Sequence, residues 1–246
     1  MGIFAHRRFG KWPDCIATAM NHFATASGLA TGYSHRQLHY NCQDAYALHK
    51  EDGFIVGVVA DGCGSGSNSE VGAQLGAAFA MNFLVRHCRR QEFDATFLLQ
   101  HLVEYLHQLR DLHQPANPAN FVENYLLFTL LGFVVTPKRT HIFHSGDGYL
   151  GVNGVIRSID HGNRPRYIGL HLIGERGAML TESLNTADLQ SLLIGTDGLR
   201  DWPDDLQQIC VEDEFFENEI ALSKRLTGLA VEGTLKDDAA GVLLRR

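Results

Sequence analysis

The sequence lacks a hydrophobic run that could cross a lipid bilayer, because its longest apolar stretch covers residues 125–135 and contains Thr129 and Gly132. The first ten residues, MGIFAHRRFG, are not followed by the apolar segment of a signal peptide. His6 occupies the position at which a myristoylation signal requires Ser or Thr. We therefore expect a cytoplasmic protein without a membrane partner.

Cysteines and basic residues are also few. The sequence has five cysteines, an odd number, and no C-x-x-C pair, which disfavours a disulfide framework and a zinc site. Lys and Arg number 21 against 28 Asp and Glu, which gives a net charge of -7, so no nucleic-acid partner is expected. A negative protein also repels a phosphorylated substrate unless cations sit in its site.

No internal repeat or linker rich in Pro, Gly or Ser divides the chain, so we expect one domain over residues 1–246. Apolar periodicity predicts helices over residues 70–88 and 94–112, and a weaker helix over residues 214–229. The segment TPKRT, residues 136–140, predicts a hairpin turn. Short apolar runs predict strands over residues 15–24, 45–48, 54–60, 126–135, 141–144, 149–152 and 192–195. This order of elements indicates an α+β protein with antiparallel sheet and external helices.

Aspartates recur at the ends of these apolar runs, beside glycine or other small residues. They are Asp44, Asp61, Asp147, Asp197, Asp201, Asp237 and Asp238. A single aspartate of this kind is most often an ordinary turn residue. Several carboxylates at one end of a sheet repel each other, and they stay ionised together only when cations neutralise them. All-oxygen sites favour Mg²⁺ and Mn²⁺ over zinc, so the pattern indicates a site for these ions.

The stretch VVADGCGSGSNSEVGA, residues 58–73, follows an apolar strand and its final Asp61 with a loop of small residues. Ser67 and Glu70 have the spacing of a helix-capping box. The loop lacks the Lys of a phosphate-binding P-loop and the glycine spacing of a dinucleotide fingerprint. We interpret it as leaving room around Asp61 for ions, water and a backbone carbonyl.

Five motifs follow one another along the chain. SHRQLHYNCQDA (residues 34–45) and ADGCGSGSNSEVGA (residues 60–73) come first, and GD, TDG and DD follow at residues 146–147, 196–198 and 237–238. In this order they resemble the type 2C (PPM) family of metal-dependent protein phosphatases, most closely its compact bacterial branch. The resemblance runs from about Gly32 to the C-terminus and includes the family's central hairpin.

The resemblance implies a four-layer sandwich, in which helices flank two antiparallel sheets and a metal centre lies at one end. It also implies a Ser/Thr phosphoprotein phosphatase that uses two Mn²⁺ or Mg²⁺ ions and a weaker third ion. Its partners would be phosphoserine and phosphothreonine proteins, together with a cognate kinase. Two divalent ions activate a water molecule and stabilise phosphoryl oxygens during in-line displacement.

The resemblance also assigns roles to single residues. Asp61 would bridge both metals, the Gly62 carbonyl would bind the second, and Asp44 would act through metal-bound water. Asp147 and Asp201 would serve the third ion. The implied catalytic set is Asp44, Asp61, Asp197 and Asp237. The implied metal ligands are Asp61, Gly62, Asp197, Asp237, Asp147 and Asp201. The second residue of the DD motif is expected to form hydrogen bonds instead.

Three positions depart from the family pattern. Gln43 replaces the Glu before the first aspartate, His39 replaces the phosphate-binding Arg, and Cys63 replaces a proposed general acid His. Arg36 is an alternative phosphate ligand, and a buried Cys is most often a small hydrophobe. These departures leave two alternatives open: a pseudophosphatase that binds without turnover, and an enzyme that hydrolyses a small phosphoester.

Overall fold

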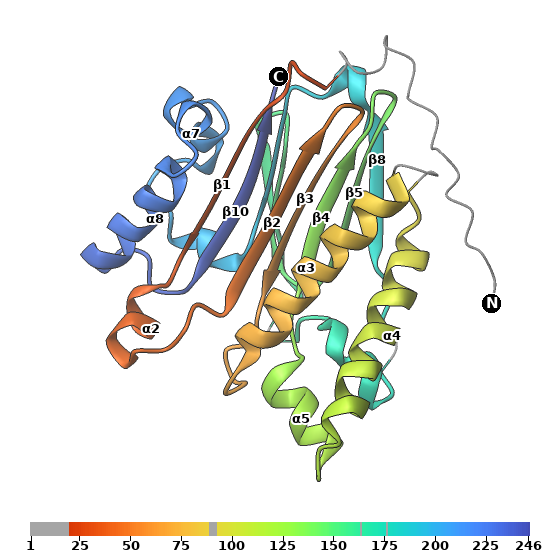
Figure 1. The fold of residues 1–246 in the computed structure, drawn as a ribbon. Helices are drawn as coiled ribbons and strands as arrows, with labels where there is room; N and C mark the ends of the chain where they lie inside the picture. Colours follow the sequence, from red (N-terminus) through yellow and green to blue (C-terminus); the bar gives the residue numbers. More distant parts are fainter. Residues whose placement is uncertain (1–19, 89–92, 163, 176) are drawn as a thin grey trace, which may run out of the picture.

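The computed structural model describes residues 20–88, 93–162, 164–175 and 177–246, whose strands form two five-stranded antiparallel sheets (Figure 1). The strand order is β1-β10-β9-β6-β7 in sheet one and β2-β3-β4-β5-β8 in sheet two. Sheet one consists of β1 (Ala24–Ala30), β10 (Ala239–Arg245), β9 (Ser191–Gly195), β6 (Gly148–Val152) and β7 (Val155–Ile159). Sheet two consists of β2 (Asp44–Glu51), β3 (Phe54–Asp61), β4 (Leu130–Val135), β5 (Arg139–Ser145) and β8 (Leu180–Asn185).

Helices cover the outer face of each sheet (Figure 1). α3 (Ser69–Cys88) and α4 (Ala95–His113) lie on the side of sheet two, and α8 (Ala221–Glu232) packs on β1 of sheet one. One apolar cluster fills the space between the sheets, and a further cluster lies between each sheet and its helices. The resulting four layers confirm the implied sandwich.

The shorter helices are α2 (Tyr33–Leu38), α5 (Pro118–Tyr125), α6 (Leu206–Ile209) and α7 (Asp213–Glu217), with 3-10 helices η1 (Ile168–Ile173), η2 (Thr186–Asp188) and η3 (Asp197–Asp201).

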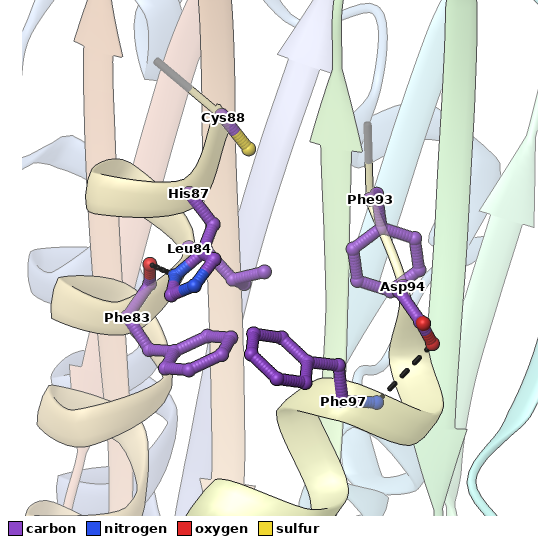
Figure 2. Close-up of a pocket in the computed structure, with 7 residues that line it drawn as sticks. All are labelled: Phe83, Leu84, His87, Cys88, Phe93, Asp94 and Phe97. Carbon is purple, nitrogen blue, oxygen red and sulfur yellow. Dashed lines mark hydrogen bonds between the residues drawn. The ribbon is translucent and has the colours of Figure 1, made fainter. Parts of the chain in front are cut away.

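Aromatic side chains occupy the space where α3 ends and α4 begins. A pocket of about 450 Å³ lies there. Phe83 and Phe97 face each other across it (Figure 2). His87 stacks on Phe83 with ring centroids 3.9 Å apart, and its Nδ1 donates to the Phe83 carbonyl oxygen at 2.9 Å. Asp94 caps α4 by accepting from the backbone N–H of Phe97 at 3.1 Å. We call this space the aromatic pocket, which is lined by Phe83, Leu84, His87, Cys88, Phe93, Asp94 and Phe97.

The two long predicted helices and the turn at residues 136–140 are confirmed. The predicted continuous helix over residues 214–229 is wrong, because the backbone carbonyl and side chain of Asn218 bond the N–H groups of Ala221 and Ile220 and separate α7 from α8. The predicted helix-capping box is also wrong, since the Ser67 hydroxyl donates to Asn124 Oδ1 at 3.0 Å.

The start of two predicted strands also changes. Residues 15–19 of the strand predicted over 15–24 lie outside the described residues, and β1 begins only at Ala24. β1 consists mostly of small residues, and α8 packs closely on it: a Cβ at Gly28 would lie 2.6 Å from the Leu222 side chain. The strand predicted from residue 126 begins at Leu130, since the Leu126 N–H still bonds to α5. The assignment of residues 1–246 to one domain stays a prediction.

Candidate metal centre

Strand pairing brings the aspartates from separate motifs to one end of the two sheets. Asp44 begins β2, Asp61 ends β3, and the two are register partners. Asp197 follows the end of β9, and Asp237 precedes the start of β10, the strand that pairs with β9. Asp147 lies between β5 and β6, and β6 also pairs with β9. Antiparallel pairing therefore explains why motifs far apart in sequence meet.

These strand ends surround a cavity of about 140 Å³, which we call the acidic pocket. Its lining residues are Gln43, Asp44, Asp61, Gly62, Gly64, Asp147, Pro165, Tyr167, Asp197, Asp237 and Asp238. Asp201 does not line it: its carboxylate accepts a bond from the backbone N–H of Lys236 at 2.9 Å. No Lys or Arg lines this pocket within the described part of the chain, so its lining carries negative charge alone.

Asp44 and Asp61 are difficult to ionise without a nearby cation. Asp44 is 3% exposed, and its Oδ2 accepts a bond from the Thr196 hydroxyl at 2.5 Å. Desolvation, followed by the charge of Asp61, raises the pKa of Asp44. Desolvation, followed by the charge of Asp197, likewise raises the pKa of Asp61. A bound cation would relieve both the repulsion and part of the desolvation penalty.

Asp197 and Asp237 are more exposed and lie beside a guanidinium group. Arg200 Nη2 is 2.7 Å from Asp197 Oδ2 and 3.7 Å from Asp237 Oδ2. Burial raises the pKa of Asp197, whereas the charge of Arg200 acts in the opposite direction. Arg200 was not predicted from the sequence, although its place three residues after Asp197 could have indicated it.

Asp238 anchors the chain segment that leads into β2. Its Oδ1 accepts from the backbone N–H of Gly32 at 2.7 Å, and its Oδ2 accepts from the backbone N–H of Gln43 at 2.6 Å. His35 Nδ1 donates to the same Oδ2 at 2.9 Å. The side chain of Asp238 is 2% exposed, compared with 51% for Asp237. Asp238 therefore holds the residue before Asp44 in place through hydrogen bonds.

The glycines after β3 have two different physical reasons. A Cβ at Gly62 would lie 2.7 Å from the Gln43 carbonyl oxygen, so the close approach of the neighbouring backbone requires glycine there. A Cβ at Gly64 would meet only the Gln43 amide oxygen, at 3.8 Å. The interpretation of the loop as open space around Asp61 therefore applies to Gly64 and not to Gly62.

The loop after β7 supplies two residues of the site that were not predicted from the sequence. His161 donates to Asp147 Oδ1 from its backbone N–H at 2.9 Å and from Nδ1 at 2.5 Å. Tyr167 lines the acidic pocket, and burial, followed by a hydrogen bond with Cys63, raises the pKa of its phenol. The Cys63 thiol is also 3.1 Å from the Ser65 hydroxyl. No strand or helix periodicity in the sequence marks these loop residues.

The departures from the family pattern at Gln43 and His39 take different positions. Gln43 lines the acidic pocket, and its side-chain amide donates to the Gly66 carbonyl oxygen at 3.3 Å. His39 ends α2 in a left-handed conformation, with φ of 56°. Neither His39 nor Arg36 lines the acidic pocket, and both are exposed. Neither residue therefore takes the place of the family's phosphate-binding arginine in this pocket.

The donor set of the acidic pocket fits hard divalent cations. Six aspartates line it, and oxygen ligands of this kind suit Mg²⁺ and Mn²⁺. Among the described residues, no three His, Cys, Asp or Glu side chains already converge as ligands on one point. The present partners explain this: Asp44 bonds to Thr196, and Asp197 pairs with Arg200. Metal binding at Asp197 would therefore compete with its ion pair to Arg200.

The chain is similar to phosphatases in both family and structure. The family model described as Protein phosphatase 2C matches residues 31–230. A bacterial serine phosphatase has a TM-score of 0.63 and 17% identity, over 91% of this chain and 98% of its own. Stp1 from Staphylococcus aureus, a serine/threonine phosphatase, has a TM-score of 0.60 and 17% identity, over 98% of each chain. The PstP catalytic domain, in complex with 2 manganese ions, has a TM-score of 0.59 and 16% identity, over 91% of this chain and 97% of its own.

The family match covers most of the chain, so the chain belongs to the protein phosphatase 2C family. This membership assigns it to the protein serine/threonine phosphatases. No curated protein matches the chain. Among the described residues, no helix combines the length and apolar character needed to cross a membrane.

Proposed function

We propose that this chain is a metal-dependent serine/threonine phosphoprotein phosphatase. The observation that carries the proposal is the acidic pocket, in which six aspartates meet at the ends of strands from both sheets. The family membership supports the same reaction class. We further propose that the enzyme uses two Mn²⁺ or Mg²⁺ ions, is located in the cytoplasm, and acts on proteins phosphorylated by a cognate kinase.

Asp61, Asp197, Asp237 and the Gly62 carbonyl would hold the two ions, and Asp44 would orient water near them. The bound ions supply charge neutralisation and activation of a water nucleophile. Asp61 and Asp44 face each other across the β2–β3 pair, so their carboxylates are placed before any ligand arrives. Asp238 keeps Asp44 in position by bonding to the preceding backbone N–H. Asp147 and Asp201 remain proposed ligands of a weaker third ion.

The test is release of inorganic phosphate from phosphoserine and phosphothreonine peptides with Mn²⁺ and with EDTA. The proposal is supported if the wild type releases phosphate only with Mn²⁺, the Asp61→Asn variant releases none, and the Asp94→Asn variant releases as much as the wild type. Asp94 caps α4 far from this chemistry, and Asn retains the capping role.

Two other results would replace the proposal. Mn²⁺ binding without any turnover would favour a pseudophosphatase. This alternative is open because Gln43, His39 and Cys63 depart from the family pattern. Turnover of p-nitrophenyl phosphate but of no phosphopeptide would favour a small-phosphoester hydrolase.

A further inference from the structure

The guanidinium of Arg200 lies at the edge of the acidic pocket. It is 2.7 Å from Asp197 and 3.7 Å from Asp237, two of the proposed metal ligands. Its side chain is 54% exposed, so it can leave this position without opening the core. Arg200 and a divalent ion compete for the same carboxylate oxygens, because two cations at one carboxylate pair repel each other.

The acidic pocket also needs a cation for the substrate. A phosphomonoester brings negative charge to a pocket lined by six aspartates, and an arginine fork binds phosphate oxygens in a bidentate manner. His39 occupies the position at which the family pattern has a phosphate-binding arginine. Neither His39 nor the alternative Arg36 lines the pocket. Arg200 already contacts two lining residues, Asp197 and Asp237, through its Nη2.

We propose that Arg200 is an exchangeable cation of this site. It pairs with Asp197 and Asp237 when they hold no metal, and it binds the substrate phosphate when these carboxylates hold divalent ions. The inference rests on the proposed function and deepens it by naming the phosphate-binding residue. It predicts opposite effects of one substitution on two ligands, which a merely structural role would not produce.

Two titrations by calorimetry test the exchange without requiring turnover. Mn²⁺ is titrated into metal-free protein, and inorganic phosphate is then titrated into Mn²⁺-saturated protein. Arg200→Gln should lower the Kd for Mn²⁺ about threefold to tenfold, because an exposed ion pair no longer has to be broken. The same variant should raise the Kd for phosphate about tenfold or more. Arg200→Lys keeps the charge without the fork and should lie between the wild type and Arg200→Gln in both titrations.

Arg225→Gln is the matched control for net charge. Arg225 pairs with Asp204 at 3.6 Å and lies over the Trp202 ring, outside the acidic pocket lining. This variant should change either Kd less than about twofold, since exposed charges at a distance are screened.

The outcomes separate this inference from the proposed function. Wild-type protein that binds no Mn²⁺ would overturn both. Wild-type Mn²⁺ binding with an unchanged or weaker Mn²⁺ affinity in Arg200→Gln would overturn the exchange alone. Unchanged phosphate affinity in Arg200→Gln would also overturn it, because the displaced guanidinium would then have no role at the substrate.

Discussion

The aromatic pocket and the acidic pocket differ in size and in how their polar groups are satisfied. The aromatic pocket has about 450 Å³, and the acidic pocket has about 140 Å³. In the larger space, His87 and Asp94 bond to the backbone of their own helices (Figure 2). In the smaller space, Asp44 and Asp61 have raised pKa values because burial and neighbouring carboxylates oppose their ionisation. Unbalanced charge, rather than volume, therefore distinguishes the candidate site.

The largest expected effect is on activity at the acidic pocket. Asp61→Asn removes a charge that the ions need, so we expect phosphopeptide turnover to fall by about a hundredfold or more. Steady-state phosphate release at saturating Mn²⁺ measures this effect. Asp94→Asn is the matched substitution at the aromatic pocket and should retain wild-type turnover. Equal losses in the two variants would remove the distinction between the pockets.

The corresponding effect at the aromatic pocket is on stability. Phe83 is 6% exposed and contacts His87 and Phe97, so Phe83→Ala should lower the free energy of unfolding by about 3–5 kcal/mol. Urea denaturation of the metal-free protein measures the loss. Phe83→Leu, which keeps more volume, should cost less. In both variants the Mn²⁺ affinity of the folded protein should stay within about twofold, and a larger change would show that the pockets are coupled.

Asp237 and Asp238, neighbours in the acidic pocket, have different roles. The sequence predicted a hydrogen-bonding role for Asp238, and the structure gives this carboxylate three donors: the backbone N–H groups of Gly32 and Gln43, and His35 Nδ1. The single amide oxygen of an Asn at this position cannot accept from all three donors as the two carboxylate oxygens do. We now expect a loss of about 1–3 kcal/mol in the free energy of unfolding, measured without metal. Asp237→Asn should not reduce metal-free stability, because it removes charge from a repulsive cluster. The opposite ranking would contradict these assigned roles.

The smallest expected effect is the pH dependence of stabilisation by metal. Asp44, Asp61 and Asp197 have raised pKa values in the folded protein, so this state keeps protons that the unfolded chain has lost. Their contribution to stability is therefore lost as pH rises above about 4 through the folded pKa values. Bound Mn²⁺ offsets this loss. The difference between the Tm measured with Mn²⁺ and the Tm measured with EDTA should therefore grow from about pH 5.5 to about pH 8. A difference that shrinks over this range would contradict the cause given for the shifts.

The sequence predicted the elements whose patterns are local. The apolar periodicity of α3 and α4 predicted their boundaries within one or two residues. The six aspartates that line the acidic pocket were also identified from the sequence motifs alone. The position of β1 was predicted wrongly, because its mostly small residues form a strand through pairing with β10 and packing under α8. That partner is distant in the chain, so no local pattern marks it.

The missed site residues depend on the same kind of distant contact. Tyr167 reaches the acidic pocket from a loop, and His161 reaches it by bonding to Asp147. The helix-capping interpretation of Ser67 failed because Asn124 of α5 takes its hydroxyl. Local spacing identifies which groups have suitable chemistry, whereas tertiary packing decides which partner each group selects.

Equilibrium dialysis against Mn²⁺ measures directly whether the acidic pocket is a metal centre. We expect the wild type and Asp94→Asn to retain about two Mn²⁺ ions per chain, in line with a two-metal site. Asp61→Asn, which lacks the proposed bridging ligand, should retain fewer. Wild-type protein that retains no Mn²⁺, or Asp61→Asn protein that retains as much as the wild type with equal affinity, would contradict the claim.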